Sequence, residues 1–218
     1  MVDQPSPRPR RDHGARPSKQ QLLRGARQAF AALGYHGATM QRIADHAGCT
    51  KPTLYAHFAD KEAIYRETVE SEIEALQTRL FETYAVAREL PLYDQISASM
   101  LVFFEYAAAE PDGFRLLFGD NGGGPLEHAR AEMVGQIRLR IAELSRSYAA
   151  GLGLKLGPSA DVLAAMMVSV AIDGAHQSIL VTPVDPIAAG QLATHFTAAA
   201  LRHLDPAYLN RIDRTAEG

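Results

Sequence analysis

The chain of 218 residues is long enough for one large domain or two small ones, and its hydrophobic fraction of 47% is ordinary for a globular protein rather than a disordered one. Its one cysteine, Cys49, excludes an internal disulfide, and no Cys/His cluster has the ligands of a structural zinc site, so we expect neither a metal nor a cofactor. We recognise no uncharged apolar run of about 18 residues and no apolar leader, which favours a cytoplasmic protein over a membrane protein.

Charge is distributed unevenly along the chain. Residues 1–61 carry ten Lys or Arg against four acidic residues, a net charge of +6, whereas the remainder carries twelve basic and twenty-one acidic residues, a net charge of −9. A basic first third followed by an acidic remainder fits a module that binds a polyanion, joined to a body that DNA would repel. The alternative is a chance imbalance of surface charge, and charge alone does not decide between the two.

The N-terminal segment, residues 1–17, contains four prolines and no apolar periodicity, which predicts a flexible basic arm. A helix is predicted to begin after Ser18, because Gln21 completes a capping box and apolar residues follow at helical spacing. Gly34 is predicted to end that helix. The arginines of the arm either contact DNA or remain solvated; they are Arg8, Arg10, Arg11 and Arg16.

Two short helices and one long helix are predicted next. Thr39 caps the first short helix, which Gly48 ends, and Thr50 caps the second. Asp60 caps the long helix, which extends to the region of Tyr84 because apolar residues recur at helical spacing that far.

The remainder of the chain shows helical patterns and no strand pattern, so the predicted fold class is all-α. Residues 120–125 contain three consecutive glycines and are predicted to form a loop. The segment Ser159–Val181 is almost free of charge, and we expect it to be buried on nearly every face. The predicted helices are Tyr93–Ala109, Asp112–Phe118, Leu126–Ala150, Ser159–Val181 and one from Asp185 to about His203.

The spacing of three small or apolar residues predicts a helix-turn-helix between about Thr39 and Phe58. Ala44 is small enough for the second helix to cross close to the first, Gly48 takes the turn, and Leu54 anchors the second helix. These residues lie within a cap, helix, glycine, cap, helix order in the basic third of the chain. An ordinary helical hairpin is therefore the weaker interpretation.

A longer set of residues around this motif has a familiar pattern: Phe30, Gly34, Thr39, Ile43, Ala44, Ala47, Gly48, Thr53, Leu54, Tyr55, His57, Phe58 and Lys61. With these residues, the segment of about 20–65 resembles the N-terminal signature of the TetR family of transcriptional regulators. The resemblance implies an all-α protein of about nine helices, with a three-helix DNA-binding head and a larger body that binds an effector and dimerises through its last two helices. The expected domains are an arm (1–17), a helix-turn-helix domain (18–62) and a ligand-binding and dimerisation domain (63–218).

Side-chain chemistry suggests which residues of the head contact DNA. Lys51 and Thr53 lie on or near the exposed face of the third predicted helix, which makes them candidates for reading bases in the major groove. Thr39 and Lys61 lie at two helix N-termini, where the cap hydroxyl, the free N–H groups and the helix dipole favour a phosphate.

The resemblance implies further contacts in the same region. Tyr55 and His57 are expected to contact phosphates, although the alternative for His57 is a packing role between helices. Pro52 stands where the family most often has glycine, and it removes a backbone donor that would otherwise meet a phosphate. We therefore expect the DNA contacts near Pro52 to differ from those of the family.

The body is predicted to hold a pocket for a hydrophobic effector. Asp173, His176 and Gln177 are polar residues at i, i+3, i+4 spacing on an otherwise apolar helix, so they anchor a ligand, face a dimer partner or are hydrogen-bonded within the core. A lining rich in Phe and Met suits a hydrophobic ligand, although the same residues would also make an ordinary core. The candidates are Phe81, Phe103, Phe104, Tyr106, Phe114, Leu117, Phe118, Met133, Ile137, Met166, Met167 and Val170.

The stretches 103–106 and 111–118 are similar to TetR-family regulators of lipid metabolism, which makes a fatty acyl chain or acyl thioester the first expected effector and an aromatic or drug-like molecule the second. We expect a homodimeric repressor on a palindromic DNA operator, with an effector that shifts the separation of the two heads. An enzyme is disfavoured because no GxSxG, HExxH or phosphate-loop pattern occurs. A third possibility, a DNA binder without a ligand, would be favoured by the lack of a pocket.

Overall fold

The computed structural model describes residues 17–119, 124–182 and 184–216, and every regular element in these ranges is helical. This confirms the predicted all-α fold class. The predicted basic arm, apart from Pro17, lies outside the described residues. In chain order the elements are α1 (Lys19–Gly37), α2 (Met40–His46), α3 (Lys51–Tyr55), α4 (Lys61–Ala87), α5 (Leu92–Ala109), α6 (Pro111–Phe118), α7 (Glu127–Gly151), α8 (Ser159–His176), the π-helical turn η1 (Gln177–Val181), α9 (Pro186–Arg202) and α10 (Pro206–Ala216).

Side-chain caps fix where the first four helices begin. The Ser18 hydroxyl accepts a hydrogen bond from the Gln21 backbone N–H at 3.3 Å, and the Gln21 side chain accepts one from the Ser18 N–H at 2.8 Å, which confirms the capping box. Thr39, Thr50 and Asp60 each accept a hydrogen bond from the backbone N–H three residues later. The predicted starts of α2, α3 and α4 are therefore confirmed as well.

Two glycines adopt the left-handed backbone that their predicted roles require. Gly34 has φ +68° and interrupts α1, so the predicted helix end is seen as a break followed by one short turn up to Gly37. Gly48 has φ +62° and ends α2 in the turn of the helix-turn-helix.

Helices α1, α2 and α3 pack around a small apolar core. Leu22, Phe30, Ile43 and Leu54 are at most 1% exposed, so each helix contributes at least one fully buried side chain. The approach of α1 to α2 is close, because Gly25 lies directly against the Ala47 backbone at the end of α2 and leaves no room for a side chain.

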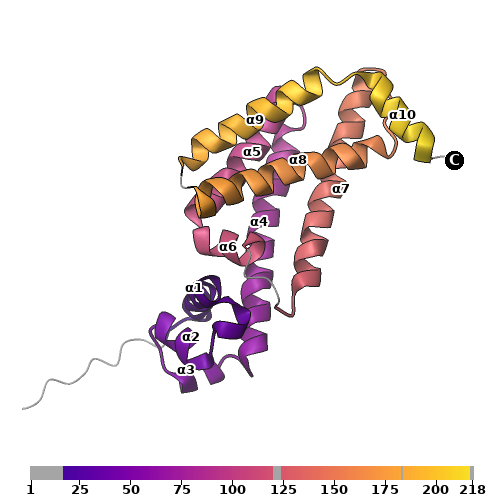
Figure 1. Ribbon diagram of the computed structural model, residues 1–218. Coiled ribbons are helices and arrows are strands. Elements are labelled where there is room, and N and C mark those ends of the chain that lie inside the picture. The colour runs from indigo at the N-terminus through magenta and orange to yellow at the C-terminus, as the bar shows by residue number, and fades with distance from the viewer. Residues whose placement is uncertain (1–16, 120–123, 183, 217–218) are drawn as a thin grey trace, which may run out of the picture.

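Helix α4 is the longest helix, and it extends from the head into the body (Figure 1). It packs against α1 at the head and against α5, α6 and α7 in the body. At the head end the Tyr65 ring meets Phe30 edge-on, with ring centroids 4.9 Å apart. Helix α4 is therefore part of the packing of both the head and the body.

The rest of the body is a bundle in which α5 packs against α9, α7 against α8, and α8 against α9 (Figure 1). The sequence patterns did not predict α10, which follows the last predicted helix after a short turn and packs against α8. Apolar and polar residues are mixed in it, and none of the residues from Pro206 to Thr215 is fully buried.

Helix α8 differs from the expectation that it is buried on nearly every face. Together with η1 it is long and apolar enough to cross a membrane by length and composition, yet only 22% of its most apolar window is buried. Its buried side packs within the bundle through small residues such as Ala164 and Ala175. Met166 is 60% exposed and Phe196 on the neighbouring α9 is 62% exposed, so the described chain leaves an apolar face uncovered here.

The same Gly→Ala change is expected to have opposite effects at two helical positions. In Gly25→Ala the new methyl group overlaps the Ala47 backbone, so we expect destabilisation by about 1–3 kcal/mol. In Gly135→Ala, within α7, nothing lies within 4 Å of the new methyl group, and we expect stabilisation by about 0.5–1 kcal/mol. Urea unfolding of both variants measures the two changes, and a shift of the same sign in both would contradict the close approach of α1 and α2.

Candidate DNA-binding surface and ligand cavity

The helix-turn-helix is closed by backbone hydrogen bonds and one buried anchor. The Cys49 N–H donates to the Ala44 carbonyl at 2.9 Å across the turn, and Leu54 is fully buried beneath α3. Because the opposite side of α3 is exposed, Lys51 and Pro52 face solvent and Tyr55 is 54% exposed. This short helix therefore presents a basic and aromatic surface of the size that fits a DNA groove.

Three other predicted DNA contacts have different surroundings. Thr53 is half-buried, and its hydroxyl shares a hydrogen bond of 2.9 Å with the Thr50 hydroxyl, which orients it within α3. His57 is exposed, so it does not pack in the interior between helices. Thr39 is exposed at the start of α2, beside Arg42, an exposed residue that the sequence patterns did not single out. A basic residue one turn after a helix cap is a signal that would have identified Arg42.

Lys61, which was predicted to contact a phosphate, also contacts helix α1 of the head. Its ammonium group donates to the Tyr35 carbonyl at 2.9 Å and lies 4.3 Å from the centre of the Tyr35 ring. Lys61 therefore fastens the start of α4 to the end of α1.

Arg27 of α1 joins the head to the body through two carboxylates. Its Nη1 atom lies 3.0 Å from Oε1 of Glu72 on α4 and 2.8 Å from Oε2 of Glu110, which precedes α6. The Tyr106 hydroxyl donates to the other oxygen of Glu72 at 3.2 Å. Gly113 of α6 lies so close to the Glu72 carboxylate that any side chain there would overlap it.

The Arg27 guanidinium group keeps its positive charge at this junction. Burial lowers the pKa of Arg27, but the two glutamates raise it by more, so the guanidinium group remains protonated. The side chains of Arg27 and Glu72 are 17% and 12% exposed, so their interaction is weakly screened by solvent. Loss of Arg27 would leave both carboxylates without their counter-charge, whereas loss of either carboxylate would leave Arg27 paired with the other.

A cavity of about 200 Å³ lies inside the body. Residues from α4, α5, α6, α7, α8, α9 and α10 form its wall, and none of them carries a charged side chain. The wall consists of Leu80, Tyr84, Ala87, Leu92, Gln95, Ile96, Ser99, Met100, Phe103, Phe118, Ile137, Ile141, Leu144, Ser145, Tyr148, Ala149, Leu152, Leu154, Leu156, Leu163, Met167, Val168, Ala171, Ile172, Leu201, Leu204, Pro206 and Leu209.

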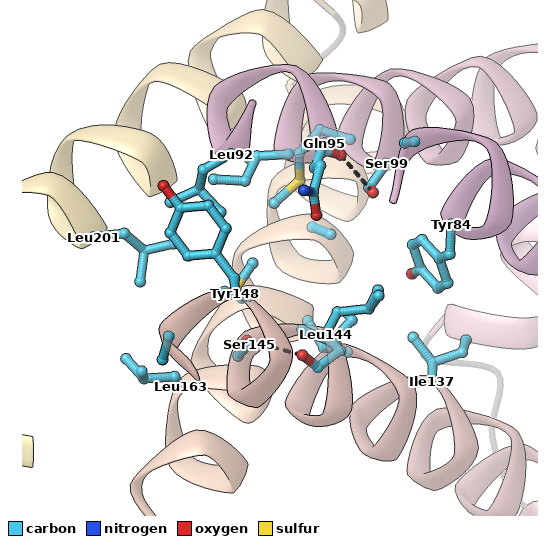
Figure 2. Close-up of a pocket in the computed structure, with 18 of the residues that line it drawn as sticks. Tyr84, Leu92, Gln95, Ser99, Ile137, Leu144, Ser145, Tyr148, Leu163 and Leu201 are labelled. Carbon is cyan, nitrogen blue, oxygen red and sulfur yellow. Dashed lines mark hydrogen bonds between the residues drawn. The ribbon is translucent and has the colours of Figure 1, made fainter. Parts of the chain in front are cut away.

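Most polar groups of the cavity wall are already engaged (Figure 2). The hydroxyls of Ser99 and Ser145 donate to the Gln95 and Ile141 carbonyls of their own helices, both at 2.8 Å. The Gln95 amide nitrogen donates to backbone carbonyls of the loop before α5, that of Leu90 at 2.8 Å among them. The space between these groups suits an apolar ligand body.

Comparison with known proteins identifies the head. Residues 22–68 match the family model described as bacterial regulatory proteins, tetR family. This match likens the head and the start of α4 to the TetR family.

Two curated relatives of this chain are transcription factors that it matches over part of their length. The transcriptional activator FasR of Mycolicibacterium smegmatis is 33% identical over 98 residues, which are 45% of this chain and 44% of FasR. The transcriptional repressor AcnR of Corynebacterium efficiens is 42% identical over 48 residues, which are 22% of this chain and 26% of AcnR. The chain thus covers less than half the length of either relative.

Solved structures extend the likeness to the whole fold. The transcriptional regulator FadR of Bacillus subtilis, whose structure is a complex with stearoyl-CoA, superposes with a TM-score of 0.67. The superposition covers 83% of this chain and 97% of FadR at 15% sequence identity, so it concerns the fold alone.

The structure brings only some of the predicted ligand contacts to the cavity. Phe103, Phe118 and Ile137 line it, as does Met167. The others lie in the core, on the surface or between the two. Five of them are buried in the core away from the cavity: Phe104, Tyr106, Phe114, Leu117 and Met133. Phe81 and Met133 line a separate groove between α4 and α7. Met166, Asp173 and Gln177 are exposed, and Val170 and His176 are half-buried outside the cavity wall.

A prediction of the lining from Phe and Met residues does not identify the polar residues of the cavity wall. Tyr84, Gln95 and Tyr148 each occupy a position on the inner side of a helix. Asp173 and Gln177 were singled out instead for their spacing on α8, yet both face out of the bundle. Polar residues on the inner sides of α4, α5 and α7 are the sequence signal that indicates the cavity wall.

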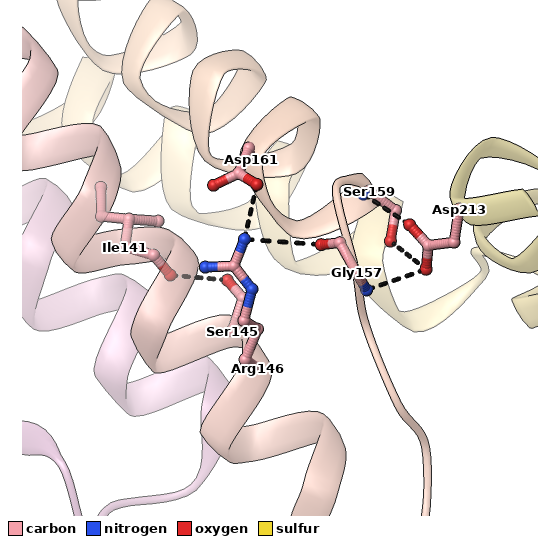
Figure 3. Close-up of polar contacts among 7 residues, drawn as sticks. All are labelled: Ile141, Ser145, Arg146, Gly157, Ser159, Asp161 and Asp213. Carbon is pink, nitrogen blue, oxygen red and sulfur yellow. Dashed lines mark hydrogen bonds and ion pairs between the residues drawn. The ribbon is translucent and has the colours of Figure 1, made fainter. Parts of the chain in front are cut away.

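Helix α10 closes one end of the cavity through Pro206 and Leu209 and is fastened there by Asp213 (Figure 3). The Asp213 carboxylate accepts from the Gly157 N–H at 2.9 Å, the Ser159 N–H at 2.7 Å and the Ser159 hydroxyl at 3.0 Å. Burial alone would raise the pKa of Asp213, but these hydrogen bonds outweigh it and lower the pKa. Asp213 thus caps the start of α8, which has no side-chain cap of its own.

Replacing this cap is expected to loosen α10. Asp213→Asn places an amide NH₂ against N–H and O–H donors, so we expect a loss of about 1 kcal/mol in the free energy of unfolding, as for a lost helix cap, and faster amide exchange at Gly157 and Ser159. Asp161→Asn is the matched control, because Asp161 lies in the first turn of α8 but pairs with Arg146 at the surface, and its effect is expected to be smaller. Unchanged exchange at Gly157 and Ser159 in Asp213→Asn would contradict the cap.

Proposed function

We propose that this protein is a dimeric, cytoplasmic, sequence-specific regulator of transcription whose affinity for DNA is set by a hydrophobic effector bound in the body. The observation that carries the proposal is the uncharged cavity wall, because two helices that form it, α4 and α6, also pack against α1 of the head. A ligand in the cavity thus contacts the same helices that hold the head in place. The presence of a cavity also favours this proposal over a DNA binder without a ligand.

The proposed DNA surface is the exposed side of α2 and α3. Lys51 and Thr53 are proposed to read bases, and Tyr55 and His57 to contact phosphates, since three of the four are exposed and the fourth is oriented by a hydrogen bond. Thr39 and Lys61 are proposed as further phosphate contacts at the starts of α2 and α4. Pro52 is exposed beside them and has no N–H to donate.

A fatty acyl chain or acyl thioester is the proposed effector. The cavity wall is almost entirely apolar, which suits a hydrocarbon chain, and the FadR structure of the same fold holds stearoyl-CoA. An aromatic or drug-like molecule is the second candidate, because Phe103, Phe118 and the tyrosines of the wall would pack against its rings.

The proposed route from effector to head passes through Arg27. Helix α6 carries Phe118 at the cavity and begins immediately after Glu110, whose carboxylate binds Arg27. Helix α4 carries Leu80 at the cavity and Glu72, the other partner of Arg27, two turns earlier. An effector that moves α4 relative to α6 therefore changes the geometry of both ion pairs, and a coupling free energy of about 1–3 kcal/mol would change DNA affinity roughly five- to 150-fold.

The exposed apolar face of α8 and α9 is the proposed dimer interface, as the resemblance to the family implies. Met166, Leu192 and Phe196 are 60–70% exposed in the single chain, which a partner copy would cover. Asp173 and Gln177 are exposed on the same helix, so a position at the edge of this interface is the proposed role for both. Repression relieved by the effector is the proposed mode of action.

The assignment of bases and phosphates predicts distinct phenotypes for two substitutions. Lys51→Ala is expected to change the sequence preference in a selection from random DNA, whereas Tyr55→Phe is expected to weaken binding to all sequences by a similar factor of about 3–10. Lys155→Ala, an exposed lysine of the body, is the control for loss of one positive charge and should change neither. Uniform weakening in Lys51→Ala, with a salt dependence reduced by about one ion, would instead assign Lys51 to a phosphate.

Native mass spectrometry of the purified protein tests the proposed function as a whole. We expect a mass of two chains with a bound amphiphile. The amphiphile should be missing from Ala171→Trp, in which the new side chain blocks the cavity. A monomeric mass at micromolar concentration would exclude the dimer, and a protein that binds the selected DNA equally with and without any hydrophobic ligand would exclude the effector.

A further inference from the structure

Tyr84 brings a hydroxyl group without a partner to the cavity. The residue is 4% exposed and belongs to the cavity wall, and no residue in the described ranges forms a hydrogen bond with its hydroxyl. Figure 2 shows the Tyr84 hydroxyl directed toward the space between Gln95 and Leu144. The hydroxyl therefore faces the space of the cavity rather than a partner atom of the chain, and a ligand that fills this space must accept its hydrogen bond or leave it unsatisfied.

The other polar groups of the wall emphasise this position. The two serines donate to carbonyls of their own helices, so they offer a ligand little. The Gln95 nitrogen is held by two loop carbonyls, at 3.2 Å from Arg88 O and 2.8 Å from Leu90 O, which leaves the Gln95 amide oxygen as an acceptor on the cavity side. The wall therefore offers two neutral donors, Tyr84 of α4 and the more exposed Tyr148 of α7, and one neutral acceptor from α5.

The electrostatics of the cavity restrict what Tyr84 can bind. Burial raises the pKa of Tyr84, so its hydroxyl stays protonated at neutral pH and acts as a hydrogen-bond donor. No charged side chain lines the wall, so a carboxylate placed inside would lose its hydration without gaining a counter-charge. The group that meets Tyr84 must accept a hydrogen bond and be neutral.

We propose that Tyr84 is the polar anchor of the cavity and donates a hydrogen bond to a neutral carbonyl oxygen, as in an ester, thioester or ketone, on an otherwise hydrophobic ligand. This inference rests on the proposed function in that it takes the cavity to be the effector site. It narrows the effector class, because an esterified acyl chain accepts the Tyr84 hydrogen bond without burying a charge, whereas a free fatty acid anion would bury its charge without a counter-charge. The carbonyl lies among the residues of α4 and α5, and the hydrocarbon chain fills the apolar remainder of the cavity.

Tyr84→Phe is the variant that tests this role, since it removes the hydroxyl and keeps the ring. The reporter is N-phenyl-1-naphthylamine, an apolar fluorophore without a carbonyl group, and the two competitors are methyl decanoate and decanoate at neutral pH. Tyr148→Phe is the matched control, because Tyr148 also lines the cavity but is 36% exposed and its hydroxyl is closer to solvent. Ala171→Trp fills the cavity and shows whether the fluorophore binds there.

We expect methyl decanoate to bind Tyr84→Phe about 3- to 10-fold more weakly than the unchanged protein, the effect of one neutral hydrogen bond. The affinity for the fluorophore is expected to be the same in both proteins, and Tyr148→Phe should leave both affinities unchanged. Decanoate should bind the unchanged protein at least about tenfold more weakly than its methyl ester, the loss expected when an anion is buried without a partner. Without ligand, Tyr84→Phe should unfold at the same temperature or a higher one, because the lost hydroxyl has no partner in the free protein.

Equal affinity of Tyr84→Phe and the unchanged protein for methyl decanoate would overturn the inference while leaving the cavity as the effector site. Tighter binding of decanoate than of its ester would also overturn it, because the cavity would then accept an anion. A lower unfolding temperature of ligand-free Tyr84→Phe would show that the hydroxyl is structural, which again contradicts the proposal. Failure of the fluorophore and both competitors to bind, or binding that Ala171→Trp does not reduce, would overturn the proposed function together with this inference.

Discussion

The ion pairs of Arg27 with Glu72 and Glu110 are the constraint on which the relation between head and body depends. One guanidinium nitrogen of α1 lies within 3.0 Å of a carboxylate on α4 and of another at the start of α6. The arrangement places three helices at one charged point with little exposure to solvent. Removing Arg27 from this cluster leaves both carboxylates without their counter-charge, and a buried charge left unpaired costs about 3–5 kcal/mol, compared with at most about 1 kcal/mol for breaking an exposed pair. Helix α1 is therefore held in one orientation as long as α4 and α6 keep their spacing.

The remaining contacts between head and body reinforce this orientation. Lys61 of α4 donates to the carbonyl of Tyr35, and Arg130 of α7 donates to the hydroxyl of Tyr65, whose ring centroid lies 4.7 Å from that of Tyr35. The end of α1 is therefore attached at this point to helices that continue into the body. The cavity lies at the other end of the same helices. Burial of a ligand there, the proposed event, acts on α4 and α6, which also pack against α1 of the head.

Local sequence chemistry predicted the head better than it predicted the cavity, and the reason is the range over which each is determined. The caps at Ser18, Thr39, Thr50 and Asp60 act within three residues, so their outcome can be read directly from the sequence. The difference between Phe103, which lines the cavity, and its neighbour Phe104, which is buried against α9, depends on which helix lies opposite each ring. Helical periodicity indicates which side of a helix is inside, but it does not distinguish the wall of a cavity from a filled core.

The remaining differences have similar causes. Helix α10 is held at the start of α8 by the polar contacts of Asp213. Asp213 and its partners Gly157 and Ser159 are separated by more than 50 residues in the chain. Helix α8 is apolar on a face that the single chain leaves exposed, so its composition reflects more than the packing of one chain. In the sequence Tyr84 marks only the end of a helical pattern, and its position in the cavity wall depends on the helices around it.

The central claim is that occupancy of the cavity is transmitted to the head through α4, α6 and the Arg27 ion pairs. Hydrogen exchange of the full chain, measured with and without saturating methyl decanoate, tests it without knowledge of the operator. The account predicts changed exchange in the backbone of α6 and of α1 around Arg27, in addition to protection in the helices that line the cavity. Changes confined to the cavity wall, with α1 unaffected by bound ligand, would contradict it.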